Sequence, residues 1–171
     1  MFRTEIKYGI ITGIGICLWI LAEYFLGLHT NKMEIGEITI YFAIIIPLIT
    51  ICLGIKEKRD KANKGNISIY NGIKTGLMIS LISTVILAIF LIIYFNYINP
   101  EYTEMGVAYH KTKMIRRGKS SVEIELETEK IRAMLGYVNQ FLFGTLGIIG
   151  SGFIISVVAA LVLKKDAETI S

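Results

Sequence analysis

The sequence predicts an all-α membrane protein with four transmembrane helices and a partly helical extramembrane loop between the third and fourth spans. Hydrophobic residues make up 53% of its 171 residues and the mean hydropathy is +0.59, whereas soluble domains are about 45–50% apolar even when glycine is counted. The charged residues, 19% of the chain, lie between long uncharged runs rather than within them. That segregation is typical of a chain that crosses a bilayer.

Four segments are long and apolar enough to be spans, because a helix needs about 20 mainly apolar residues to cross a hydrocarbon core of ~30 Å. We place them at about residues 8–28, 38–55, 77–98 and 141–163, within a single domain of residues 1–171. The first follows two basic residues, as a signal peptide would, but its apolar run exceeds the roughly 7–15 residues of such a peptide. Pro47 lies inside the second span, where neighbouring helices satisfy the freed carbonyl, so it predicts a kink rather than a break.

The distribution of lysine and arginine predicts that both termini are cytoplasmic. The loop between the second and third spans is short and basic, with Lys56, Lys58, Arg59, Lys61 and Lys64. Short basic loops stay on the cytoplasmic side. The third loop, residues 99–140, has more positive charges, but it is the longest loop, and charges far from a span contribute little to orientation.

Part of the third loop is predicted to fold as a helix, since loops of this length usually carry structure of their own. Ser120 and Glu123 have the spacing of a capping box. The run from Val122 to Glu127 also alternates apolar and polar residues, which is a strand pattern, but a lone strand would have no partner. We therefore predict a helix from about Ser121 to Leu135, lying along the membrane surface or capping the bundle.

Small residues recur at every fourth position in three of the spans, and such stripes let membrane helices approach closely. They are Gly9 and Gly13 in the first span, Gly72, Gly76, Ser80 and Thr84 along the third, and Gly152, Ser156 and Ala160 in the fourth. The stripes predict either helix packing within one four-helix bundle or the face of a homodimer, and both interpretations stay open.

A pattern of glycines and spacing also runs along the chain. It consists of Ile6-Lys7-Tyr8-Gly9 with Gly13, Lys64-Gly65-Asn66-Ile67-Ser68-Ile69 with Gly72 and Gly76, Ile98-Asn99-Pro100, and Gly150 to Ala160 followed by Lys164-Lys165. This pattern resembles the family named domain of unknown function 4199, over nearly the whole chain. The resemblance implies a four-span bacterial inner-membrane protein, typical of the Bacteroidetes group, and brings no reaction, ligand or catalytic residue. Gly136-Tyr137 departs from the family, in which proline often precedes the fourth span.

Glu23 is the one ionisable residue within a predicted span, and an intramembrane carboxylate is a functional hypothesis by default. It lies five residues from the end of its span, only about 7–8 Å at 1.5 Å per residue, so we expect its carboxylate to reach headgroup water. A structural or interfacial role is the leading interpretation, and proton handling is the alternative. His29 and His110, the only histidines, have no close ligand spacing around them, so we predict no metal site.

These observations predict an integral membrane protein that is not an enzyme and needs no cofactor. We find no phosphate-binding loop, dinucleotide fingerprint, nucleophile elbow or zinc-protease helix in the sequence. We expect a structural or interaction protein in the lipid bilayer, forming a homodimer or binding an unidentified membrane partner, with no role for nucleic acid. The alternative is a small oligomeric transporter or channel that uses Glu23.

Overall fold

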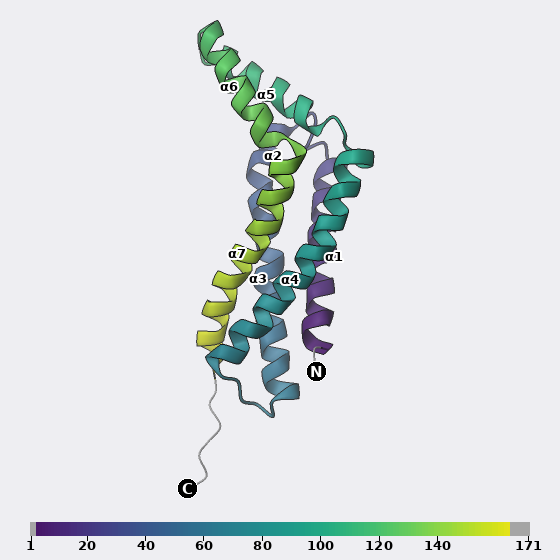
Figure 1. Ribbon diagram of the computed structural model, residues 1–171, viewed down its shortest axis with the longest axis vertical. Helices are drawn as coiled ribbons and strands as arrows, with labels where there is room; N and C mark the ends of the chain where they lie inside the picture. The colour runs from purple at the N-terminus through teal and green to yellow at the C-terminus, as the bar shows by residue number, and fades with distance from the viewer. Residues whose placement is uncertain (1–2, 165–171) are drawn as a thin grey trace.

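The computed structural model describes residues 3–164, and every regular element among them is helical. Three spans are long single α-helices: α1 (Arg3–Phe25), α4 (Ile69–Ile93) and α7 (Tyr137–Leu163). The second span is a composite of α2 (Met33–Thr39), the 3-10 segment η1 (Ile40–Ile44), α3 (Ile45–Glu57) and the π-helical turn η2 (Lys58–Ala62). Four helical segments are long and apolar enough to cross a membrane, and Figure 1 shows them running roughly alongside one another. This is the architecture of a membrane-embedded protein.

The observed helices differ in their bounds from the predicted spans because single caps and turns, and not hydropathy alone, fix where a helix begins and ends. The third begins at Ile69 rather than 77, where the Ser68 hydroxyl accepts a hydrogen bond from the Asn71 backbone N–H (3.3 Å) and caps the helix. The first ends at Phe25 rather than 28, because Gly27 adopts a positive φ of 77° and turns the chain back. The fourth begins at Tyr137 rather than 141.

Pro47 lies just after the irregular part of the second span. A proline has no N–H for the carbonyl four residues earlier, and that residue, Ala43, lies in the 3-10 segment η1. The chain therefore stays helical from Met33 to Ala62, but its hydrogen-bond pattern tightens at Ile40–Ile44. The helix is therefore not broken at Pro47, and the local irregularity is the 3-10 segment that precedes it.

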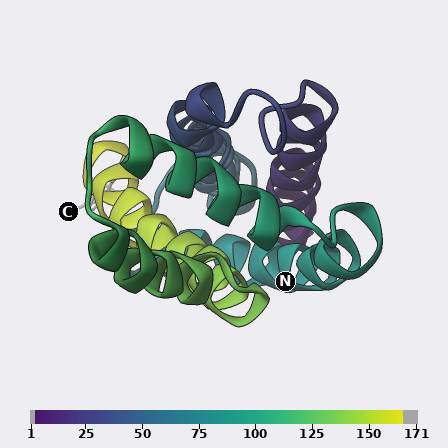
Figure 2. The same cartoon turned by 90° about the horizontal axis from the view of Figure 1, so that it is seen from above.

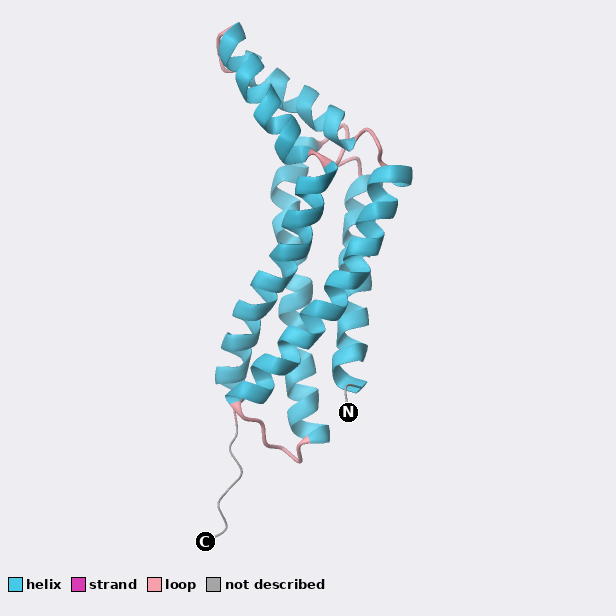
Figure 3. Ribbon diagram, in the orientation of Figure 1, coloured by secondary structure: helices cyan, strands magenta, loops and turns pink. Residues whose placement is uncertain are grey.

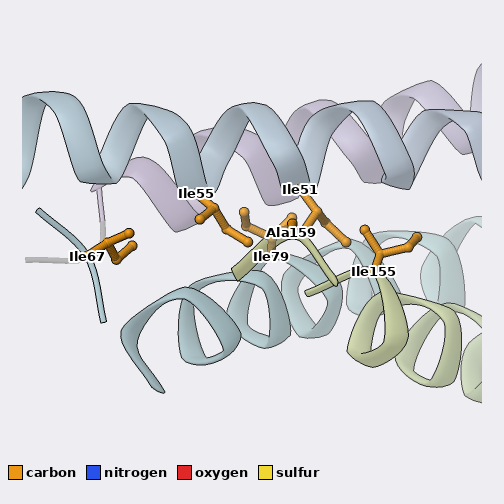
Figure 4. Close-up of a cluster of buried hydrophobic side chains, with 6 residues drawn as sticks. All are labelled: Ile51, Ile55, Ile67, Ile79, Ile155 and Ala159. Carbon is orange, nitrogen blue, oxygen red and sulfur yellow. The ribbon is translucent and has the colours of Figure 1, made fainter. Parts of the chain in front are cut away.

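Helix α4 is the centre of the bundle, since it packs along both α7 and α1, while α3 contacts all three. In Figure 1, α4 crosses diagonally from α7 at one end to α1 at the other. The start of α1, the end of α7 and the loop after η2 all lie at the same end of the bundle. At that end, six residues form a closed core, drawn in Figure 4: Ile51, Ile55, Ile67, Ile79, Ile155 and Ala159.

The other end carries a helical hairpin of α5 (Tyr102–Arg116) and α6 (Ser121–Leu135), which follows the π-helical turn η3 (Tyr94–Ile98). Seen from above, α5 runs across the end of the bundle (Figure 2). Helix α6 has the predicted bounds, and the capping box between Ser120 and Glu123 is complete. The prediction missed α5, so the loop between the third and fourth spans is more helical than expected; Figure 3 shows only short loops in it.

Candidate functional site

A cavity of about 480 Å³ lies between all four spanning segments, in the half of the bundle nearer the hairpin. We call it the bundle cavity. Ligand sites typically occupy about 300–1,000 Å³ and are mainly apolar with a few polar groups, and this wall has that character. Its main lining residues are Ile16, Trp19, Ile20 and Glu23 of α1, His29, Ile40, Tyr41, Ile44 and Pro47 of the second span and the turn before it, Leu87, Leu91, Tyr94, Phe95 and Tyr102, and Gln140, Phe143, Gly144, Gly147, Ile148 and Ser151 of α7.

At this level of the bundle, side chains do not fill the space between the four spans. The 3-10 segment and Pro47 shape one wall, and glycines of α7 shape the opposite wall. At Gly147, an added Cβ would meet no atom of the described residues within 4 Å. Two lining aromatics, Tyr41 and Phe143, are largely exposed, so the cavity reaches the lipid-facing surface between η1 and α7.

Glu23 lies at the polar end of the bundle cavity and is buried, with 2% of its surface exposed. The expectation that its carboxylate reaches headgroup water is wrong. The cause is the turn that follows α1: Leu28 donates its backbone N–H to the Glu23 carbonyl (2.9 Å), and this brings the next residue, His29, back over the helix end. The His29 Nε2 atom lies 3.5 Å from Glu23 Oε2.

A chain of hydrogen bonds leads away from this pair. His29 Nδ1 lies 2.6 Å from the hydroxyl of Tyr94, and Asn99 Nδ2 donates to the same hydroxyl at 3.1 Å. Tyr94 and Asn99 are almost fully buried. The Tyr94 hydroxyl thus joins the side chains of Asn99 and His29. With Nδ1 engaged by Tyr94, the other ring nitrogen of His29, Nε2, faces Glu23.

Two polar atoms near these hydrogen-bonded side chains have no hydrogen-bond partner within residues 3–164. They are Glu23 Oε1 and Trp19 Nε1. Both atoms are buried, and both residues line the bundle cavity. Buried polar groups are paired in most proteins, and each exception needs an explanation. Here the two exceptions lie one helical turn apart on α1.

A second cavity of about 340 Å³ lies between α2 and the hairpin and shares His29, Ile40, Tyr41, Tyr102 and Gln140 with the first. We call it the hairpin cavity. On its rim, Lys113 Nζ donates to Glu37 at 2.7 Å, and this bond raises the pKa of Lys113. Burial lowers the pKa of His110, whose Nε2 lies 3.8 Å from Glu37. Burial, with a smaller effect of the Glu23 charge, raises the pKa of Tyr102, where the two cavities meet.

The chain matches, over residues 7–165, the family described as protein of unknown function DUF4199. The chain belongs to this family. The match covers nearly all of it, as the glycine pattern led us to expect. No curated protein and no solved structure matches it.

In this DUF4199 protein the small residues of α4 and α7 face each other within one chain. A Cβ on Gly72 would lie 2.7 Å from the Ala160 Cβ, and one on Gly76 would lie 2.6 Å from the Ser156 Cβ. Gly152 faces Ser80 in the same way, at 2.7 Å from the Ser80 Cβ. These residues therefore line an internal seam and not an outer face.

The remaining predicted packing residues lie elsewhere. Gly9 and Gly13 of α1 face α4, where a Cβ would meet the Cβ atoms of Ile82 at 2.6 Å and Ile86 at 2.8 Å. Thr84 is half-buried, and its hydroxyl has no hydrogen-bond partner in the described part of the chain. Fully buried Ser83 lies next to it and donates to the Ser80 carbonyl instead.

Each histidine lies next to one carboxylate. Among residues 3–164, no three His, Cys, Asp or Glu side chains are placed to hold a metal ion. His29 lines both cavities, and His110 lines the hairpin cavity. Sequence reasoning identified Glu23 but missed His29 and Tyr94 as its neighbours.

Proposed function

We propose that this DUF4199 protein is a non-enzymatic binding protein of the bacterial inner membrane that holds an amphiphilic membrane molecule in the bundle cavity. The observation that carries the proposal is the cavity itself, with apolar walls, a polar end at Glu23 and His29, and a mouth toward lipid. Hydrocarbon is favourable against such walls, and a few polar groups at one end orient the occupant.

The position of the cavity suits a molecule that partitions into the bilayer. Toward the opposite end, the six-residue core that includes Ile51 and Ile79 fills the bundle. The site is therefore a blind pocket and not a pore. In the proposed orientation, with both termini cytoplasmic, the mouth faces the outer leaflet and the hairpin stands outside the membrane. The basic residues predicted as a loop, which the structure places at the end of α3, in η2 and just after it, then lie inside, as the rule for positive segments requires.

Native mass spectrometry of the protein released from mild detergent tests this proposal. We expect a bound amphiphile on the wild type, and loss of that mass from Gly147→Leu, which adds a bulky side chain at the cavity wall. Gly150→Leu is the matched control, because a Cβ there also meets no described atom within 4 Å and Gly150 does not line the cavity. A wild type without adduct, or a Gly147→Leu variant that keeps it, contradicts the proposal.

A small oligomeric transporter or channel is the second candidate, favoured by the buried carboxylate of Glu23 at the cavity end. In that case Glu23 exchanges a proton during transport, as intramembrane carboxylates of transporters do. Vesicles loaded with a pH-sensitive dye test it. A proton flux that depends on the protein and is lost in Glu23→Gln favours transport, whereas no flux above protein-free vesicles leaves the binding function.

The partner surface of the protein is a separate part of the proposal. Because the stripes of α4 and α7 are used inside the chain, a homodimer would meet through other lipid-facing residues. An unidentified membrane partner would use the same faces. Crosslinking in native membranes, with the mass of the product, distinguishes a second copy from another protein.

A further inference from the structure

Resting on the proposed binding function, we propose that the occupant of the bundle cavity is a lipophilic cation: a hydrocarbon body with one ammonium-type nitrogen held at Glu23. Both a free alkylammonium and the headgroup of an amine-bearing phospholipid have this chemistry. The inference rests on the charge of the site, on the rings around it and on the unpaired atoms that face it.

The polar end of the cavity contains one carboxylate, and no lysine or arginine lines the cavity. The basic side chain beside this carboxylate is that of His29, whose Nε2 atom lies 3.5 Å from Glu23 Oε2. No lysine or arginine of residues 3–164 forms an ion pair with Glu23. A buried carboxylate is costly unless a positive charge or several donors compensate it, so an ammonium group from the ligand completes the pair that the protein leaves open.

The second oxygen of the carboxylate is the atom that the ligand would meet. Glu23 Oε1 is buried and, within the described chain, accepts no hydrogen bond. His29 lies on the side of Oε2. Thr39 and Trp19 also lie beside the carboxylate, but no donor of the described residues meets Oε1 at hydrogen-bond distance. A primary ammonium can donate to it, and a quaternary ammonium can pair with it by charge alone.

Aromatic rings line the cavity near this end. The rings of Tyr94 and Tyr102 lie 5.9 and 5.7 Å from that of His29, and Trp19 and Phe95 also line the cavity. The ring centroid of Phe95 lies 5.3 Å from that of Tyr94 and 5.5 Å from that of Tyr102, and both ring pairs are arranged edge to face. Such arrangements turn ring faces in different directions, and ring faces attract cations, most strongly when the cation is removed from water. An aromatic enclosure with one carboxylate favours an organic cation over a neutral or anionic head.

Trp19 is the only tryptophan of the chain, so its fluorescence reports on the cavity. We would reconstitute the protein in phosphatidylglycerol vesicles, which contain no lipid ammonium, and titrate two spin-labelled amphiphiles of equal chain length. One is an alkyldimethylammonium carrying a nitroxide at its head, and the other is the uncharged nitroxide ester. A nitroxide quenches tryptophan on contact, and the Gly147→Leu variant gives the quenching from probe in the surrounding bilayer.

We expect the cationic probe to quench wild-type Trp19 at about one-tenth of the concentration that Glu23→Gln requires, which is a loss of about 1.4 kcal/mol. The neutral probe should act alike on both proteins. Glu23→Asp, which keeps the charge, should keep the preference and shows that a loss in Glu23→Gln is not a folding defect. Glu37→Gln is the matched control, since it removes a carboxylate that lies in the hairpin cavity.

The outcomes separate this inference from the function on which it rests. If Glu23→Gln leaves the cationic titration unchanged while Gly147→Leu blocks both probes, the cavity binds amphiphiles and the cation inference fails. If Gly147→Leu changes neither titration, both fail. Where the inference holds, competition identifies the source: added phosphatidylethanolamine displaces the probe if a lipid headgroup is the ligand, and dodecylamine alone does so if a free amine is.

Discussion

Gly76 of α4 and Ser156 of α7 touch so closely that a methyl group on the glycine would overlap the serine hydroxyl. Gly152 and Ser80 repeat the contact with the roles of the two helices exchanged. Without a hydrophobic driving force between helices in lipid, such close approach is what holds membrane helices together. The seam between α4 and α7 therefore holds in place the α7 residues that line the bundle cavity.

Gly76→Ala should destabilise the bundle by about 1–3 kcal/mol, the usual cost of overpacking. Thermal unfolding in detergent measures this. Ser156→Gly in the same chain should restore most of the stability, because it removes the two nearest atoms that the new methyl group meets and leaves only Ile51 Cγ2 at 3.0 Å. Gly150→Ala should not destabilise, since a Cβ there meets no described atom within 4 Å. Equal losses at Gly76 and Gly150 would show that glycine flexibility, and not the seam, governs stability.

Lys58→Met should destabilise the protein by about 3 kcal/mol, because it leaves a buried carboxylate without its charge partner. Lys58 pairs with Glu5, which is 1% exposed and whose second oxygen has no hydrogen-bond partner in the described residues. Lys61→Met is the matched control: Lys61 is largely exposed and lies 3.7 Å from Glu57, so its loss should change little. Unfolding curves of the two variants should differ, and coinciding curves would contradict the prediction.

Ser120→Ala should loosen the first turn of α6 by about 1 kcal/mol, a typical value for a lost N-cap. The amides of Val122 to Ile124 should then exchange hydrogen about fivefold faster than in the wild type, measured at neutral pH. Amides in the middle of α7 should be unchanged. Unchanged exchange at the first turn would mean that the hairpin contacts alone hold this end of α6.

The same cap should weaken in acid. The hydrogen bonds from the Ser120 side chain and backbone lower the pKa of Glu123, so the folded state binds this proton less readily than the unfolded state. The stabilisation is therefore present above the unfolded pKa of about 4.3 and is lost as the pH falls through the lowered folded value. Relative to Glu123→Gln, protection of the first turn should fall with acid in the wild type only.

Single cysteines at Arg117 and Lys61 should report opposite sides of the membrane, after replacement of Cys17 and Cys52. Both positions are exposed and lie at opposite ends of the bundle. An impermeant thiol reagent should label Arg117→Cys in intact cells and Lys61→Cys only after permeabilisation. The reverse pattern would place the hairpin in the cytoplasm.

The spans could be predicted because hydropathy is a property of the local sequence, whereas helix ends depend on single caps. Ser120 was read as a cap because Glu123 stands at the matching position, but Ser68 has no such companion. Helix α5 was missed since its buried face consists only of Gly106, Val107 and Met114, too few apolar residues to give a helical pattern.

Glu23 could be singled out because a charge inside an apolar run stands out in any sequence. Its environment could not be predicted, since that environment is assembled from distant segments. His29 returns to it through a turn that requires Gly27 in a left-handed conformation, and Tyr94 and Asn99 come from the far end of another span. In the sequence, Gly27 was a signal for the turn, whereas no pattern pointed to Tyr94 or Asn99 as neighbours of His29.

The connection between α6 and α7 is one residue long and is held by side-chain hydrogen bonds. Only Gly136 separates the two helices, at φ −59° and ψ 146°, and the Asn139 and Gln140 side chains donate across it to the carbonyls of Ala133 and Met134. The hairpin and the upper part of α7 are thus held at a fixed bend at Gly136. Gln140 belongs to the walls of both cavities, so the residue that secures this bend also shapes both sites.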